Sequence, residues 1–145
     1  MSQDNVELVR RGHETFNLRD LEAYLSLHLP EVEFTPYERA IEGLGPYHGH
    51  AGVRQWWREA LEILPDLTVQ LKELRDMGDA VLVHGQLRGH GAGSGASFER
   101  TYWGVFRCRD QSVASWYAFQ TEAEALEAVG CGSSDSTRST KRPLK

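Results

Sequence analysis

Three things are scarce in this sequence: cysteine, long apolar runs and basic charge. It contains two cysteines, Cys108 and Cys131, which excludes a disulfide framework and makes a reducing cytoplasm the expected location. No apolar run approaches the ~20 residues that cross a bilayer, and the opening MSQDNVELVRR has no apolar signal core, so we expect no membrane partner. Lys and Arg number 16 against 21 Asp and Glu, a net charge of −5, which argues against nucleic acid as a partner.

The composition that remains is typical of one globular domain. Hydrophobic residues make up 40% and charged residues 26% of the 145 residues. A chain of this length buries ~65–70% of its unfolded surface, so it can fold without a disulfide or a metal. Residues 131–145 differ, because they are rich in Ser, Thr and Gly and have Leu144 as their only large apolar residue. We therefore predict a folded domain over residues 1–130 and a disordered polar tail over residues 131–145.

Residues at helical spacing predict two helices near the start of the chain, the first from Val6, Val9, His13 and Phe16, and the second one short. The first begins at Asp4, where Glu7 three residues later completes a capping box. The second begins at Asp20 and is ended by Pro30. A strand is expected next, because apolar side chains alternate with other side chains over residues 32–37.

The clearest helix follows a loop that contains glycine and proline. Its apolar residues fall at i, i+3, i+4, i+7, i+8 and i+11, a wide stripe suited to packing against a sheet. Pro65 ends this helix. The stripe consists of Val53, Trp56, Trp57, Ala60, Leu61 and Leu64.

Four strands and a last helix complete the domain. Thr121 and Glu124 form a second capping box, which opens a helix that Gly130 closes. The resulting order is ααβαββββα, with helices first and antiparallel hairpins later, so the predicted fold class is α+β. The four strands are expected over residues 67–72, 80–88, 98–109 and 113–120.

Four short motifs accompany this order of elements. They are LPEVEF at residues 29–34, YHGHAGV at 47–53, the hairpin RGHGAGSG at 88–95 and TEAEALEA at 121–128. With these motifs the chain resembles the nuclear transport factor 2-like superfamily and, within it, the SnoaL-like proteins. The similarity covers about residues 4–130.

The resemblance implies a cone: a strongly curved antiparallel sheet wrapped around the long helix, with a pocket at the wide end. It also implies a homodimer formed through the outer face of the sheet. The sequence supports the dimer, since Trp103 and Val105 lie on one face of their strand and Tyr102 and Phe106 on the other. In a sheet with one face in water, apolar and polar side chains alternate along each strand. A strand that is apolar on both faces therefore predicts that a second layer, here a partner subunit, covers the outer face.

Reactions known from this superfamily do not carry over to this sequence. The ketosteroid isomerases use an Asp base with a Tyr and a protonated acid as oxyanion donors. The corresponding positions here hold Thr35, Gly12 and Gly104. The Asp pair of the resembling epoxide hydrolases and the strand-centre Asp of the polyketide cyclases have no counterpart either. Because this fold also hosts non-catalytic binders, function has to be argued from the site.

A few polar residues remain as candidates for chemistry. Glu33 shares a strand face with Thr35, so we expect it to face the cavity, where a carboxylate can act as a base. The alternative is a surface residue or a structural partner of an arginine such as Arg54. His84 and Tyr102 are candidate proton donors. The expected pocket-lining residues are Tyr24, His28, Thr35, Trp57, Gly104, Trp116 and Ala118.

No metal or cofactor is expected. His48 and His50 are two residues apart in a turn, with only His90 as a conceivable third ligand. The aromatic candidates suit a flat apolar ligand, so the first hypothesis is that the domain binds a small apolar or aromatic molecule. Two alternatives stay open. One is an isomerase, cyclase or hydrolase that uses Glu33 as base, and the other is a non-catalytic protein-interaction module.

Overall fold

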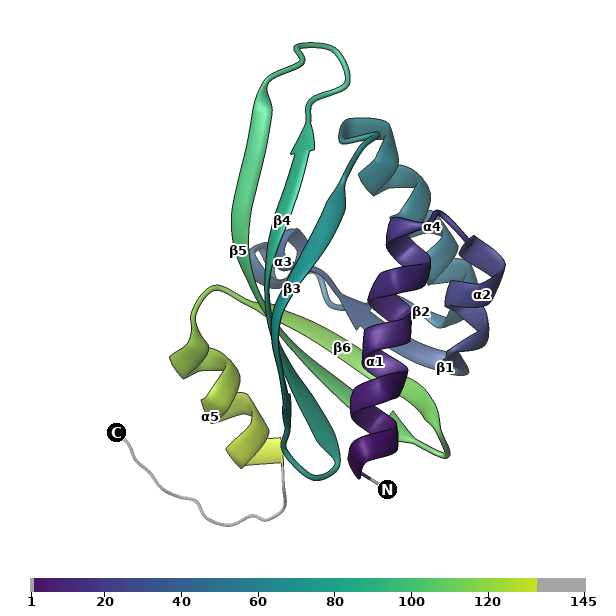
Figure 1. Cartoon of the computed structure of the whole chain (residues 1–145), viewed down its shortest axis with the longest axis vertical. Helices are drawn as coiled ribbons and strands as arrows, with labels where there is room; N and C mark the ends of the chain where they lie inside the picture. Colours follow the sequence, from purple (N-terminus) through teal and green to yellow (C-terminus); the bar gives the residue numbers. More distant parts are fainter. Residues whose placement is uncertain (1, 133–145) are drawn as a thin grey trace.

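The computed structural model describes residues 2–132, which form a curved sheet with helices on both faces (Figure 1). The helices are α1 (Ser2–Asn17), α2 (Leu21–Ser26), α3 (Tyr37–Glu42), α4 (Gly49–Ile63) and α5 (Glu122–Gly132). The strands are β1 (His28–Thr35), β2 (Tyr47–His48), β3 (Thr68–Asp76), β4 (Ala80–His90), β5 (Ser97–Arg109) and β6 (Ser112–Phe119). The predicted tail lies outside the described residues, except that residues 131 and 132 continue α5.

The sheet has six strands in the order β2-β1-β6-β5-β4-β3. All neighbours are antiparallel except β1 and β6, which run parallel. Helices α1, α2 and α4 pack on its inner face and α5 packs on its outer face (Figure 1). The predicted α+β cone is therefore confirmed.

Sequence patterns located the long elements better than the short ones. Helix α3 and the two-residue strand β2 were not expected, and Tyr37, placed in a strand by its alternation, is the first residue of α3. The physical reason is that α3 has no buried residue and so carries no apolar period. The second helix ends at Ser26 rather than at Pro30, because residues 28–30 already belong to β1.

The predicted helix caps are partly correct. Asp20 accepts a hydrogen bond from the Ala23 amide at 3.2 Å, as a cap should. Asp4 does not cap α1, because the helix begins two residues earlier and Asp4 lies in its first turn. At α5 the Thr121 hydroxyl accepts from the Glu124 amide at 3.1 Å, which is one half of the capping box. That helix runs to Gly132 rather than ending at Gly130.

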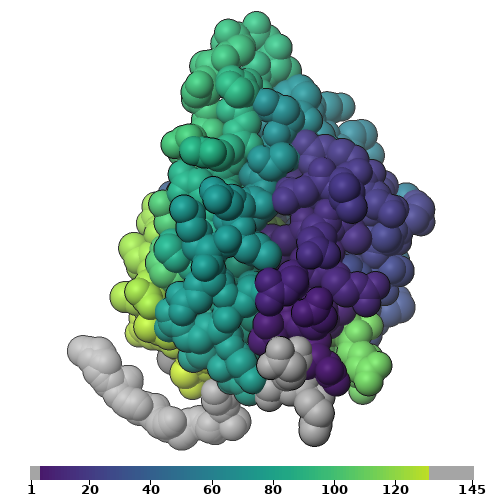
Figure 2. Space-filling model, viewed as in Figure 1, coloured from purple at the N-terminus to yellow at the C-terminus, as the bar shows by residue number. Residues whose placement is uncertain are grey.

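Two hydrophobic clusters hold the layers together. The larger one lies between α1, α2, α4 and the inner face of the sheet, and includes Phe34, Val53 and Trp57. The smaller one lies under α5 and joins Leu82 and Val105 to Ala125 and Val129. On the face shown in Figure 2, α1 packs closely beside the strands, and the tip of the β4–β5 hairpin projects at one end. None of the helices described between residues 2 and 132 has the length and apolar character needed to cross a membrane.

Candidate functional site

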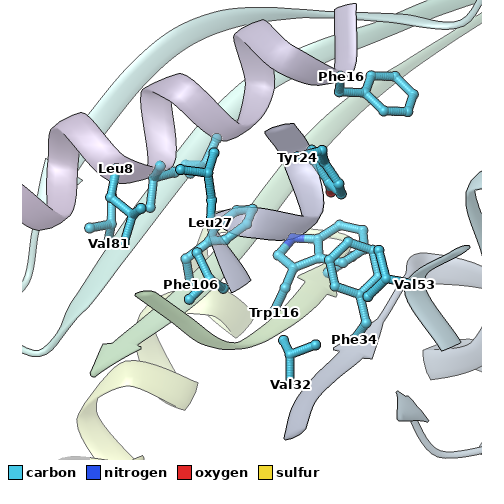
Figure 3. Close-up of a cluster of buried hydrophobic side chains, with 14 of the residues drawn as sticks. Leu8, Phe16, Tyr24, Leu27, Val32, Phe34, Val53, Val81, Phe106 and Trp116 are labelled. Atoms are coloured by element: carbon cyan, nitrogen blue, oxygen red, sulfur yellow. The ribbon is translucent and has the colours of Figure 1, made fainter. Parts of the chain in front are cut away.

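A deep cavity lies between the inner face of the sheet and the helices that cover it. Its volume is about 670 Å³, and its walls are mainly aromatic and aliphatic side chains from α1, α2, α4 and strands β1, β5 and β6. Figure 3 shows part of this interior, where Tyr24, Phe34, Phe106 and Trp116 are drawn. The rings of Phe34 and Trp116 lie 4.5 Å apart between centroids, so the two pack directly on each other. Rings placed this way form a rigid apolar wall.

Charged side chains of the lining gather at the mouth of the cavity, which we define by Tyr37, Glu38, Arg39, Tyr47, Glu59 and Arg100. Arg100 forms an ion pair with Glu38 at 3.0 Å and lies over the Tyr37 ring at 4.3 Å. The Tyr47 hydroxyl donates to Glu59 at 2.6 Å, and this hydrogen bond lowers the pKa of the Glu59 carboxyl. Both acids of the lining are thus engaged at the mouth, and neither supplies a carboxylate to the interior.

A histidine–tyrosine pair lies inside the cavity. His13 Nδ1 is 2.8 Å from the carbonyl oxygen of Val9, and a carbonyl only accepts, so Nδ1 carries the proton. His13 Nε2 is then free to accept, and the Tyr102 hydroxyl donates to it across 3.2 Å. Burial lowers the pKa of His13 to about 4 and raises that of Tyr102 well above its usual value. The pair is therefore neutral near pH 7.

Two glycines make room for the Tyr102 ring. A Cβ at Gly104 would lie 2.7 Å from Trp116 Nε1 and 2.9 Å from the Tyr102 hydroxyl oxygen. A Cβ at Gly85 would lie 2.8 Å from the carbonyl oxygen of Gln70 and 3.4 Å from the Tyr102 ring. Any side chain at position 104 would displace one of the two polar atoms. Gly104, expected as a lining residue, thus acts by leaving the space that these atoms occupy.

His28 has an arrangement similar to that of His13, with one difference. Its Nδ1 is 2.7 Å from the carbonyl oxygen of Tyr24, so this nitrogen donates and Nε2 keeps its lone pair. Burial lowers the pKa of His28 to about 4. His28 Nε2 is buried and has no hydrogen-bond partner among the described residues. The Trp116 indole nitrogen interacts with the Tyr102 hydroxyl, and this interaction partly offsets the rise in the Tyr102 pKa that burial causes.

The structure brings together most of the lining residues that the sequence suggested. Tyr24, His28, Trp116 and Ala118 surround the cavity, as does the candidate proton donor Tyr102, whereas Thr35 does not. Trp57 does not, since its ring is buried against Phe16 and Tyr24 at centroid distances of 5.1 and 5.0 Å. Its neighbour Trp56 takes the lining position.

The expectation that Glu33 faces the cavity is wrong. Glu33 is exposed and lies with Thr35 on the outer face of the sheet, whereas Val32 and Phe34 are buried on the inner face. The alternation of the strand was correct, but the wrong set of residues was assigned to the interior. The physical reason is that burying a valine and a phenylalanine is favourable, whereas burying a carboxylate is costly.

His84 also lies on the outer face, away from the cavity. Its ring stacks on Trp103 of the neighbouring strand, with centroids 4.0 Å apart and planes 3° apart. Of the three candidates for chemistry, only Tyr102 lies in the cavity. The sequence reasoning missed His13 as a site residue, because at its position in the helical period it served only as evidence for α1. The signal available was a polar residue within the apolar stripe of that helix.

The described part of the chain contains no group of three or more His, Cys, Asp or Glu side chains placed to hold a metal ion. His50, considered above as one of a histidine pair, donates instead to the carbonyl oxygen of His28 at 2.9 Å.

Comparison with known proteins agrees with this architecture. An NTF2-like protein of unknown function from Burkholderia pseudomallei is 25% identical, with a TM-score of 0.71 over 87% of this chain and 97% of that one. TerC, co-crystallised with polyporic acid, is 23% identical, with a TM-score of 0.71 over 87% and 98% of the two chains. IdmH, a putative polyketide cyclase from Streptomyces antibioticus, is 22% identical, with a TM-score of 0.66 over 86% and 96%.

No curated protein gives a significant match to this sequence. The family model of the SnoaL-like domain, by contrast, matches residues 9–116, which is most of the described chain and includes Tyr102, His28 and Trp116. The chain therefore belongs to the SnoaL-like domain family and has the NTF2-like fold.

Proposed function

We propose that this protein binds a small, mostly apolar molecule inside the cavity of the cone. The observation that carries the proposal is the cavity itself, with about 670 Å³ of space and aromatic walls. Pockets for small molecules in proteins typically measure roughly 300–1,000 Å³ and are lined mainly by apolar side chains. Among structures of similar fold, TerC was co-crystallised with polyporic acid, and a hypothetical protein with a ketosteroid isomerase-like fold from Catenulispora acidiphila is in complex with trimethylamine.

A binding role fits the interior better than the enzymatic alternative with Glu33 as base. Glu33 lies on the outer face, and the acids of the lining, Glu38 and Glu59, are engaged at the mouth. Tyr102 directs its proton to His13, and burial keeps the pKa of this hydroxyl high, so it is a poor acid near neutral pH. These groups position a ligand without supplying a proton-transfer pair.

Gly12 offers a direct test of the proposal. It lines the cavity from α1, and a Cβ built there meets no neighbouring atom within 4 Å. Gly12→Leu should therefore fill part of the cavity without a clash, and leucine also favours the helix over glycine. Gly130→Leu is the matched control, because this glycine is also helical, has equally open surroundings and lies on α5, outside the cavity.

The probe is 2-acetylnaphthalene, titrated against each protein by isothermal calorimetry. We expect one saturable site in the wild type, binding at least about tenfold weaker in Gly12→Leu, and unchanged binding in Gly130→Leu. Absence of binding to the wild type, or equal affinity in Gly12→Leu, would show that the cavity does not hold such a molecule. Circular dichroism spectra confirm that each variant is folded.

A homodimer through the outer face of the sheet is a second part of this proposal. Helix α5 covers only one part of that face, over Leu82 and Val105. Tyr117 remains 43% exposed, and its ring contacts Phe119 at 4.8 Å between centroids. An exposed tyrosine beside a half-buried phenylalanine on a sheet face fits a surface that binds a partner, and a second copy of this chain is the occupant expected from the resemblance.

A further inference from the structure

Arg39 differs from the other charged side chains at the mouth of the cavity, because its charge has no acid in direct contact. The residue belongs to α3, is half-buried and lines the cavity. Its Nε donates to the carbonyl oxygen of Gly45 at 2.7 Å, and one Nη donates to that of Leu44 at 3.3 Å. It forms no ion pair with any acid between residues 2 and 132. Carbonyl oxygens are neutral acceptors, so these bonds leave the positive charge of the guanidinium without a counter-ion.

The two acids at the mouth already bind other side chains. Glu59 accepts through both carboxylate oxygens, from the Tyr47 hydroxyl at 2.6 Å and from Gln55 at 3.0 Å. The hydrogen bond from Tyr47 is the main reason that the pKa of Glu59 is low, and the charge of Arg39 contributes least among the causes. Glu38 is ion-paired with the second arginine of the mouth at 3.0 Å. Arg39 is therefore the positive charge that remains for a ligand.

The Arg39 guanidinium is held in place before any ligand arrives. Its carbon Cζ lies 4.3 Å from the centroid of the Tyr47 ring, which is a cation–π contact. The two hydrogen bonds to carbonyl oxygens restrain the same planar group. Because little side-chain freedom is left to lose, a ligand that binds this arginine pays less conformational entropy than one that binds a free surface arginine.

The chemistry of the site favours a carboxylate at the mouth and an apolar body in the interior. Guanidinium N–H groups lie in one plane that matches two carboxylate oxygens, and hydrogen bonds between charged groups are strong. The interior, part of which is seen in Figure 3, has mainly apolar walls. Burial lowers the pKa of His13 and His28 to about 4, so neither ring carries a charge that could compensate an anion inside.

We propose that Arg39 binds the carboxylate of a ligand whose apolar body occupies the cavity. The aromatic walls suit a flat ring system, so the ligand class is a small aromatic carboxylic acid in its ionised form. This inference rests on the proposed binding function and adds to it the charged group by which the protein selects its ligand.

Two probes of nearly the same shape test the role of charge. 2-Naphthoate carries a carboxylate where 2-acetylnaphthalene carries a neutral methyl ketone. We expect the wild type to bind 2-naphthoate about tenfold more tightly than the ketone, because hydrogen bonds between charged groups are stronger than those to neutral groups. Isothermal calorimetry near pH 7 gives both dissociation constants.

A substitution of Arg39 then assigns the preference to its residue. Arg39→Gln removes the charge, so the two probes should bind with affinities equal within about twofold. The affinity for 2-acetylnaphthalene should stay within about threefold of the wild-type value, which shows that the cavity is intact. Arg58→Gln is the matched control, because Arg58 is exposed, lies outside the lining and gives the same change in net charge. This control should keep the preference of about tenfold, since solvent and salt screen an exposed charge.

The Gly12→Leu variant locates the body of the ligand. It fills part of the cavity, so it should weaken the binding of 2-naphthoate as it weakens that of the ketone. Unchanged binding of 2-naphthoate in this variant would overturn the inference, because the acid would then be held at the surface only.

The remaining outcomes separate this inference from the proposed function. If the ketone binds the wild type and 2-naphthoate binds no more tightly, the role of Arg39 fails and the binding cavity stands. A preference for 2-naphthoate that survives in Arg39→Gln also overturns the inference, because another group then holds the carboxylate. An equal loss of affinity for both probes in that variant overturns it too, since Arg39 then only supports the structure. If neither probe binds the wild type, the binding function fails and the inference fails with it.

Discussion

The two faces of the sheet carry the same kinds of residue and use them differently. The inner face presents His28 and Trp116, and the outer face presents His84 and Trp103. On the inner face three helices cover the strands and leave a cavity, so both side chains are buried, with His28 Nδ1 bound to the Tyr24 carbonyl and the Trp116 indole beside the Tyr102 hydroxyl. On the outer face the histidine and tryptophan are half-buried and stack on each other. Residue type alone therefore does not identify a site, because the covering layer decides what a side chain contacts.

The difference in how deeply the two faces are buried should have its largest effect on the free energy of unfolding. Trp57 is 8% exposed and packs on Phe16 and Tyr24, so Trp57→Ala should lower the free energy of unfolding by about 3–5 kcal/mol. Trp103→Ala is the outer-face counterpart and should cost less, because its ring is only half-buried. Urea unfolding measures both values. A loss below about 1 kcal/mol for Trp57→Ala would show that the packing between α4 and the first two helices is not as described.

The buried histidines should make the inner layers sensitive to acid. Burial lowers the pKa of both His13 and His28 to about 4, from an ordinary value of 6.5. The unfolded chain then binds more protons than the folded one between these values, so stability is present above pH 6.5 and decreases as the pH falls toward 4. From pH 7 to pH 5 each histidine should account for a loss of about 2 kcal/mol.

Unfolding in urea at a series of pH values checks this expectation. His28→Phe should remove about half of the loss between pH 7 and pH 5, since one of the two histidines is then absent. That window lies above the usual titration range of carboxylates, which keeps their contribution small. A stability that stays constant across the window would contradict the neutral, buried state of both rings.

The smallest stability change is expected at the exposed aromatic of the outer face. Tyr117→Arg should change the free energy of unfolding of the monomer by less than about 0.5 kcal/mol, because the side chain is 43% exposed. Its effect should appear in sedimentation velocity, where the wild type is expected to be a dimer at micromolar concentration and the variant a monomer. Leu18→Arg is the control, as Leu18 is 78% exposed and lies at the end of α1. A monomeric wild type would reject the dimer.

Local patterns were sufficient to predict most of the fold. The apolar stripe of α4 and the alternation in β4, β5 and β6 are strong periodic signals, and each element lies where its period predicts it. Helix α3 lacks such a signal because none of its residues is buried. Predictions of this kind fail where an element is short and is held only by the rest of the fold.

The sequence by itself determined that Glu33 and Thr35 share one face of a strand and that Val32 and Phe34 share the other, because side chains alternate along any strand. It could not determine which face would be covered by helices, since that depends on how distant elements pack. The same holds for the pairing of His13 with Tyr102, which are 89 residues apart. Only the tertiary structure brings α1 over β5 and leaves His28 and Trp116 facing one cavity, because packing of the helices on the sheet creates that space.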